Sequence, residues 1–122
     1  VSCPNLIAPS AVIDDYSTIG IGNVICANAY VGPQVSLGNN NIINTGAVIE
    51  HEVEIGNHCH IAPSSTIAGR CSISDECFIG VGSVVVDKIN VVKGITLGAG
   101  AVLVRDAVTE NAIYIGIPAR VK

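Results

Sequence analysis

The sequence predicts an all-β protein built as a parallel β-helix of hexapeptide repeats, with three short strands in each 18-residue coil. Three observations predict this fold class: an aliphatic residue at every sixth position, an interior almost without aromatic side chains, and outward positions that sort into three faces. A fixed short period is the sequence signature of a solenoid. The chain is expected to form a single domain over residues 1–122, with coils over 7–108 and a capping segment over 109–122.

The aliphatic repeat starts at Ile7 and is not interrupted by an insertion. Every sixth residue from there is Ile, Val or Leu: Ile7, Ile13, Ile19, Ile25, Val31, Leu37, Ile43, Ile49, Ile55, Ile61, Ile67, Ile73, Ile79, Val85, Val91, Leu97 and Leu103. Neither an α-helix nor a hairpin sheet has a period of six. Each unit is therefore expected to be a short β-branched strand and a corner, and three units close a coil in which residue n lies above residue n−18.

Composition fits an interior of stacked layers. Hydrophobic residues make up 49% of the chain, but aromatic residues make up 3%, and Trp and Met are absent. A second inward position, two residues before each repeat residue, favours small side chains and holds Cys59, Cys71 and Cys77. The five cysteines form no CxxC pair. We expect buried free thiols and a reducing, cytoplasmic location.

The outward positions sort into one polar face and two apolar faces. One apolar face shows Val12, Tyr30, Val48, Thr66, Val84 and Val102. The polar face shows Thr18, Ser36, Glu54, Ser72 and Asn90. The other apolar face shows Val24, Ile42, His60, Phe78 and Thr96. Two apolar faces on a slim prism favour association. A homotrimer that buries both faces of each subunit is the predicted assembly.

The segment after residue 108 leaves the repeat. Ile113, Ile115 and Ile117 alternate as in a strand, and Pro118 limits pairing beyond it. We expect this segment to cap the open end of the prism, where free backbone edges would otherwise associate with other chains.

Charge is distributed unevenly. Residues 1–69 hold five acids and no Lys or Arg, and all six basic residues follow. They are Arg70, Lys88, Lys93, Arg105, Arg120 and Lys122. This basic half fits a phosphorylated ligand or, equally well, solvated corners of the last coils. The acidic chain with few stacking residues argues against nucleic acid, and no apolar run predicts a membrane span or signal peptide.

His51 is the main candidate for chemistry. It is expected at an outward corner, with Pro33 below it and Gly69 above it. The neighbouring acids are Glu50, Glu52 and Glu54. A carboxylate beside an imidazole fixes its tautomer and suits a general base, and the Gly69 N–H could polarise a carbonyl. His60 projects from an apolar face and could meet His51 across a subunit boundary. The alternative is a solvated His51 and a His60 that only fills the interface.

A metal site is a weaker interpretation. His58 lies at the corner after that of His51, whereas His60 lies on a strand. The five-residue histidine spacing of the trimeric β-helix zinc carbonic anhydrases does not occur. We therefore expect no bound metal.

Three motifs resemble the bacterial hexapeptide-repeat sugar acetyltransferases of surface-polysaccharide biosynthesis. They are Val48-Ile49-Glu50-His51-Glu52 with His60 nine residues after His51, Ile79-Gly80-Val81-Gly82-Ser83, and Gly116-Ile117-Pro118-Ala119-Arg120. That family includes sialic-acid O-acetyltransferases and UDP-4-amino-sugar N-acetyltransferases. The resemblance covers nearly the whole chain but only the C-terminal β-helix domain of the family, and it implies left-handed coiling.

The resemblance also implies a function: acetyl transfer from acetyl-CoA to an amino or hydroxyl group of a sugar or nucleotide sugar. His51 would act as general base with Glu52 raising its basicity, and the acceptor would attack the thioester directly. The positions that match acetyl-CoA contacts of the family are His60, Gly69, Val81 and Ala99. The family usually carries an N-terminal α/β domain that binds the sugar nucleotide, and the sequence has none. A non-catalytic trimeric scaffold therefore stays open as the alternative function.

Overall fold

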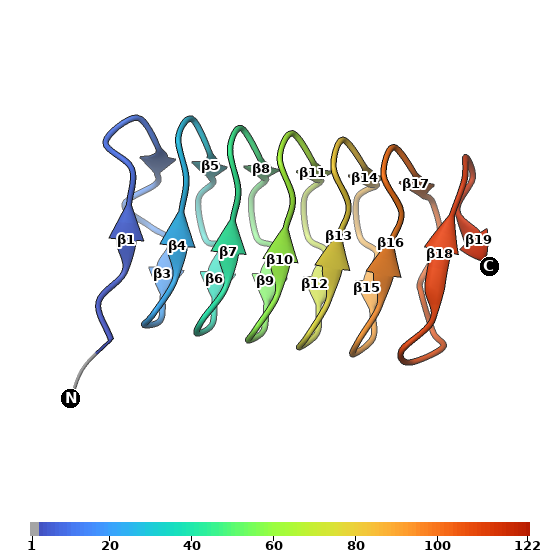
Figure 1. Ribbon diagram of the computed structural model, residues 1–122. Helices are drawn as coiled ribbons and strands as arrows, with labels where there is room; N and C mark the ends of the chain where they lie inside the picture. The colour runs from blue at the N-terminus through green and yellow to red at the C-terminus, as the bar shows by residue number, and fades with distance from the viewer. Residues whose placement is uncertain (1–2) are drawn as a thin grey trace.

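The computed structural model describes residues 3–122 and shows a left-handed parallel β-helix whose triangular coils stack along one axis (Figure 1). Strands β1 to β17 have two residues each, and every one of them ends on a residue of the six-residue aliphatic repeat. The described residues form no helix. The all-β fold and the hexapeptide coil predicted from the sequence are confirmed.

Three sheets form the three faces of the prism. The eight-stranded sheet contains β1 (Leu6–Ile7), β4 (Val24–Ile25), β7 (Ile42–Ile43), β10 (His60–Ile61), β13 (Phe78–Ile79), β16 (Thr96–Leu97), β18 (Ile113–Ile115) and β19 (Arg120–Val121). The six-stranded sheet contains β2 (Val12–Ile13), β5 (Tyr30–Val31), β8 (Val48–Ile49), β11 (Thr66–Ile67), β14 (Val84–Val85) and β17 (Val102–Leu103). The five-stranded sheet contains β3 (Thr18–Ile19), β6 (Ser36–Leu37), β9 (Glu54–Ile55), β12 (Ser72–Ile73) and β15 (Asn90–Val91).

The register confirms the 18-residue coil. His60 lies between Ile42 and Phe78 in the eight-stranded sheet, eighteen residues from each. The spacing changes in the last coil, where Val91 pairs with Ala107, sixteen residues later, and Thr96 pairs with Ile113, seventeen residues later. Because the register is constant below that point, any corner residue lies directly above the one eighteen positions before it.

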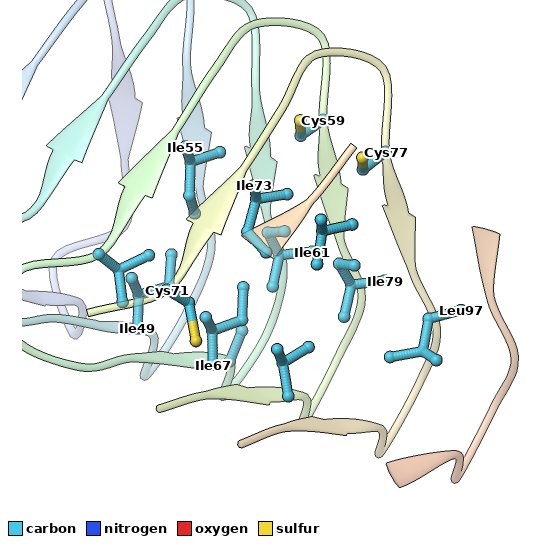
Figure 2. Close-up of a cluster of buried hydrophobic side chains, with 14 of the residues drawn as sticks. Ile49, Ile55, Cys59, Ile61, Ile67, Cys71, Ile73, Cys77, Ile79 and Leu97 are labelled. Atoms are coloured by element: carbon cyan, nitrogen blue, oxygen red, sulfur yellow. The ribbon is translucent and has the colours of Figure 1, made fainter. Parts of the chain in front are cut away.

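The aliphatic repeat fills the interior. From Ile25 to Leu103 the repeat residues are all buried, and their side chains form continuous aliphatic columns (Figure 2). The first coil differs, since Ile7 is 46% exposed and Ile13 and Ile19 are only partly buried. No described coil lies beneath them, so their side chains are covered from one side alone.

A ladder of asparagines replaces aliphatic side chains at one inward column. Asn41 is fully buried, and its amide group is satisfied: Nδ2 donates to the Gly56 carbonyl at 2.8 Å, and Oδ1 accepts the N–H of Cys59 at 2.8 Å. Asn23 holds Asn41 in the same way from the coil below. Each buried amide therefore pairs with the neighbouring coils, as buried polar groups must.

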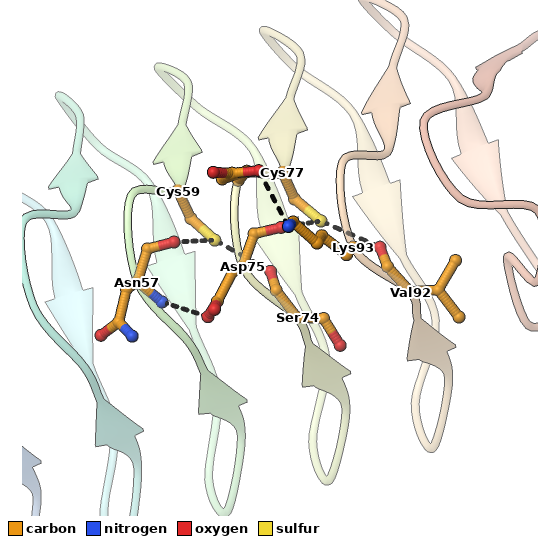
Figure 3. A network of polar contacts seen from close by, with 8 residues as sticks. Asn57, Cys59, Ser74, Asp75, Cys77, Val92 and Lys93 are labelled. Carbon is orange, nitrogen blue, oxygen red and sulfur yellow. Dashed lines mark hydrogen bonds and ion pairs between the residues drawn. The ribbon is translucent and has the colours of Figure 1, made fainter.

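Cysteines continue this column toward the C-terminus. The Cys59 thiol donates to the Ser74 carbonyl at 3.1 Å, and the Cys77 thiol donates to the Val92 carbonyl at 3.2 Å (Figure 3). Cys71, in another column, is also buried, and burial raises the pKa of its thiol. The prediction of buried free thiols at these three positions is confirmed.

The C-terminal segment contains the predicted strand. Strand β18 extends the eight-stranded sheet, and its side chains alternate: Ile113 and Ile115 face outward, and Tyr114 packs inside. In the shortened last coil Tyr114 pairs with Leu97 and so takes the inward position of the aliphatic repeat. After Pro118 the chain turns back, and β19 pairs antiparallel with β18.

Candidate active site

His51 lies at the corner between β8 and β9, where the six-stranded and five-stranded sheets meet. Its position is set by the backbone: the N–H of Glu52 donates to the Pro33 carbonyl of the coil below, and the N–H of Arg70 donates to the His51 carbonyl from the coil above, both at 3.0 Å. Glu52 has φ of +61°, the left-handed conformation that turns the chain. The corner therefore projects the imidazole outward, as predicted.

His51 and Glu52 form a hydrogen-bonded pair. His51 Nδ1 lies 3.1 Å from Glu52 Oε1, and both side chains are nearly half exposed. A carboxylate only accepts hydrogen bonds, so Nδ1 carries the proton and Nε2 of the neutral ring keeps its lone pair. The hydrogen bond from His51, followed by that from Arg70, lowers the pKa of Glu52. This arrangement orients an imidazole as a proton acceptor at Nε2.

Arg70 is a member of this cluster that the sequence analysis did not identify. Its Nε lies 3.3 Å from Glu52 Oε1, the oxygen that also accepts the hydrogen bond from His51. The signal was present in the register, because residue 70 lies one coil of eighteen residues above residue 52. Among the described residues, neither Glu50 nor Glu54 forms an ion pair or hydrogen bond with His51.

Gly69 makes room for the imidazole. A Cβ built on Gly69 would lie 2.5 Å from His51 Nε2 and 2.6 Å from Cε1, so any side chain here would displace the ring. Gly69 is buried, and no residue that the structure describes accepts a hydrogen bond from its backbone N–H. Within the described residues the Gly69 N–H therefore has no acceptor, at the corner that also carries His51.

His60 lies on β10, on the outer surface of the eight-stranded sheet. Its ring packs edge-on against Phe78, with centroids 5.0 Å apart and an interplanar angle of 79°. Asn44 Nδ2 lies 3.1 Å from His60 Nε2. Because an amide NH₂ only donates, Nε2 accepts and Nδ1 carries the proton. Asn44, which the sequence analysis did not identify, thus leaves one free N–H on His60 as a donor.

Val81 and Ala99 lie one coil apart at a different corner of the prism from His51. They follow β13 and β16, at the corner between the eight-stranded and six-stranded sheets, and the N–H of Gly100 donates to the Val81 carbonyl at 2.8 Å. Both are exposed. A single chain therefore divides the predicted site residues into two groups: His51, Glu52 and Gly69 at one corner, and His60, Val81 and Ala99 around another.

A cavity of about 250 Å³ opens at the C-terminal end of the prism. It is lined by Leu103, Val104, Arg105, Asp106, Tyr114, Pro118, Ala119 and Arg120. None of the predicted site residues lines it. It lies between the corner after β17 and the capping segment, so two arginines of the basic half of the chain border a hollow in the surface.

The described residues hold neither a metal-binding cluster nor a membrane-spanning helix. No group of three or more His, Cys, Asp or Glu side chains is placed to hold a metal ion. Within residues 3–122 there is also no helix with the length and apolarity to cross a membrane.

Comparison with known proteins matches part of the chain to a family model and nearly all of it to solved acetyltransferase structures. The model of the bacterial transferase hexapeptide (six repeats) matches residues 35–69. PerB from Caulobacter crescentus, solved with CoA and GDP-perosamine, is 36% identical over 99% of this chain, with a TM-score of 0.97. The acetyltransferase domain of PglB from Neisseria gonorrhoeae, solved with acetyl coenzyme A, is 33% identical over 99% of the chain, also with a TM-score of 0.97. This chain is therefore similar in sequence and fold to part of each of these two acetyltransferases.

This chain corresponds to only part of the two acetyltransferases. The chain spans 58% of the PerB chain and 58% of the PglB chain. AntD, an N-acyltransferase from Bacillus cereus, has a TM-score of 0.87 but 15% identity, and so shares the fold alone. A search among curated protein sequences gave no match.

Proposed function

We propose that this chain is the catalytic β-helix of an acetyl-CoA-dependent acetyltransferase whose acceptor is the amino group of a nucleotide sugar, with a sugar hydroxyl as the alternative. The observation that carries the proposal is the hydrogen bond from His51 Nδ1 to Glu52 Oε1 next to a bare Gly69. It occurs in a chain 36% identical to PerB, described as a GDP-perosamine N-acetyltransferase. The geometry supplies a base, its orienting carboxylate and a nearby N–H donor.

The proposed reaction is a direct transfer. The amine nitrogen of the acceptor attacks the thioester carbonyl carbon of acetyl-CoA, and a C–N bond forms as the C–S bond breaks. His51 Nε2 takes the proton that the nitrogen loses and returns it to the departing thiolate, which gives the acetamide and free CoA. Glu52 holds the Nδ1–H and balances the charge of the imidazolium. The Gly69 N–H is the candidate donor to the carbonyl oxygen.

The proposed site is completed between subunits. His60, Val81 and Ala99 lie on other parts of the prism than His51, so a second copy of the chain must bring them to it. A three-fold assembly would bury the exposed parts of the two apolar faces, including Phe78 at 42% exposure. In this arrangement the corner of His51 faces the wall of His60 on a neighbour, and acetyl-CoA lies in the cleft between them.

The acceptor itself is assigned only as a class. The chain spans little more than half of the relatives that it matches, and the family resemblance places sugar-nucleotide recognition in an N-terminal α/β domain. The proposed acceptor panel therefore includes GDP-perosamine and dTDP-4-amino-4,6-dideoxyglucose, which appear with the relatives, and a UDP-4-amino sugar.

The test is release of free CoA from acetyl-CoA against this panel. We expect wild type to turn over at least one amino sugar and His51→Ala to lower the rate by about 10²- to 10⁴-fold. His58→Ala is the matched control, because His58 is an exposed corner histidine of the same coil. Equal rates for wild type and His51→Ala would remove His51 from the proposed role.

A non-catalytic trimeric scaffold is the second candidate, because a single chain keeps His51 and His60 on different parts of the prism. The two functions differ in whether acetyl-CoA binds. A ligand that binds the native state raises the midpoint of thermal unfolding. A midpoint that does not move with millimolar acetyl-CoA would favour the scaffold.

A further inference from the structure

We propose that Arg70 is a positioning residue for the acetyl transfer, whose guanidinium holds the Glu52 carboxylate against the His51 ring. This inference rests on the function proposed above. It adds a residue that acts through Glu52 and not on either substrate.

One carboxylate oxygen receives two donors from consecutive coils. His51 Nδ1 lies 3.1 Å from Glu52 Oε1, and Arg70 Nε lies 3.3 Å from the same atom. Glu52 is 41% exposed, and an exposed pair of adjacent residues is weak because water competes and both side chains keep rotamer freedom. The second donor, anchored one coil away, restricts the carboxylate to the orientation that His51 needs.

The backbone of Arg70 is fixed to the same corner. Its N–H donates to the His51 carbonyl at 3.0 Å, and its φ of +62° turns the chain there. Gly69, which precedes it, leaves the space that the imidazole occupies. The side chain of Arg70 thus starts from a point tied to His51 and ends on the carboxylate that orients His51.

The chemical consequence concerns the tautomer of His51. While Glu52 accepts from Nδ1–H, Nε2 of the neutral ring has a lone pair and can take a proton. When the carboxylate rotates away, the proton is free to occupy Nε2, and that tautomer cannot act as a base at this atom. The lowered pKa of Glu52, caused by His51 and then by Arg70, agrees with a carboxylate held in its ionised form.

The test uses Arg70→Met, which keeps an unbranched stem and removes every donor. Lys88→Met is the matched control. Lys88 lies one coil above Arg70 at the same corner, with φ of +61°, and forms no ion pair with a residue that the structure describes. Both variants thus lose a cation from the same edge at the same backbone conformation.

Kinetics separate positioning from substrate binding. With the best acceptor of the panel, we expect Arg70→Met to lower kcat about tenfold with little change in the acceptor KM. An effect of this size is typical of the interaction between two residues in one hydrogen-bonded network. In a Glu52→Gln background, Arg70→Met should have no further effect. An undiminished effect in that background, or a raised acceptor KM at constant kcat, would show that Arg70 acts on the acceptor and would overturn the proposal.

A second readout does not depend on activity. At alkaline pH the imidazole ¹⁵N shifts distinguish the two neutral tautomers, and the His51 signals are assigned by their loss in His51→Ala. We expect the Nδ1–H form in wild type and in Lys88→Met, and a shift toward the Nε2–H form in Arg70→Met. An unchanged His51 spectrum in Arg70→Met would contradict the proposal. If wild type turns over no acceptor, the proposed function fails, and this spectrum alone decides the role of Arg70.

Discussion

Two corners of one coil each carry a histidine and share one backbone conformation, but they differ in the side chains that contact their backbone. At the first, Glu52 has φ of +61° and donates its N–H to the coil below; at the second, His58 has φ of +58° and does the same to Asn39. The difference lies in the residue before each. That residue is His51 at the first corner and Asn57 at the second.

At the second corner, side chains cap the backbone. Asp75 Oδ1 accepts the N–H of Asn57 at 2.8 Å (Figure 3). Asn57 Oδ1 in turn accepts the N–H of Asn39 in the coil below. Glu76 and Lys93 add an ion pair at 3.6 Å. The side chains of Asn57, Asp75, Glu76 and Lys93 thus link neighbouring coils of this stack.

At the first corner no side chain among the described residues caps the backbone in this way. Gly69 has no side chain to cap the N–H of His51, and the imidazole occupies the space instead. The comparison teaches that the coil builds corners of one geometry and that Gly69 leaves space at one of them, where the proposed base lies. The substitutions that follow fill the space at the first corner, remove hydrogen bonds at or beside the second, or remove a charge at the first.

The largest effect is expected from closing the open corner with Gly69→Asn. The side chain would collide with His51 Nε2, as a Cβ alone already lies 2.5 Å away, and it would supply the cap seen at the other corner. Displacing the base should lower acetyl transfer about 100-fold. Thermal unfolding checks that the fold persists.

Gly22→Ala is the control for this substitution. Gly22 has φ of +69° and lies at the corner between β3 and β4, a stack that holds no predicted site residue, so alanine there should cost stability and leave the rate unchanged. A Gly69→Asn variant with full activity would show that the space above His51 is not needed.

A smaller effect is expected from Asn41→Ala, which breaks the buried ladder beside the closed corner. The N–H of Cys59 and the carbonyl of Gly56 would lose their partners in the interior. We expect the free energy of unfolding to fall by about 2 kcal/mol or more. Chemical denaturation measures the free energy of unfolding. If Asn41→Ala lowers it no more than Asn57→Ala does, the buried hydrogen bonds of Asn41 do not contribute as proposed.

Asn57→Ala should weaken the closed corner only slightly. The Asn39 N–H that loses its cap is exposed and can bind water, so we expect a loss of about 0.5 kcal/mol. The rate of acetyl transfer should be unchanged. A large loss of activity would mean that both corners serve the reaction.

The smallest effect concerns pH. The pKa of Glu52 is lowered in the folded chain, so its contribution to stability is complete above the ordinary value of 4.5 and is lost as the pH falls through the lower folded value. Between wild type and Glu52→Gln, the difference in unfolding midpoint should therefore shrink below pH 4.5. Glu50→Gln is the control, and a difference that grows on acidification would reverse the assigned sign.

The sequence predicted the fold well because the aliphatic repeat is a local signal with one constant period. It predicted the burial of Cys59 and the stacking of His51 beneath Gly69 for the same reason. The repeat did not show that Tyr114 would take the inward position, because the last coil is shorter than the others and no local pattern reveals this. Arg70 could have been predicted as a neighbour of Glu52, because it lies one coil of eighteen residues after it.

Other site contacts are harder to read from the repeat. Asn44 reaches His60 across a spacing of sixteen residues, outside the constant register. The separation of His51 from His60 follows from their sheets, but whether a neighbouring copy joins them depends on surfaces that meet only in the assembly.

The central claim is that one chain supplies His51 and its neighbour supplies His60 to a shared site. Mixing His51→Ala and His60→Ala chains in equal amounts, by unfolding and refolding together, tests it most directly. Random three-fold assemblies would then contain intact clefts, and we expect CoA release to recover to about a quarter of the wild-type rate, although each variant alone is nearly inactive. A mixture no more active than the separate variants would contradict a site shared between subunits.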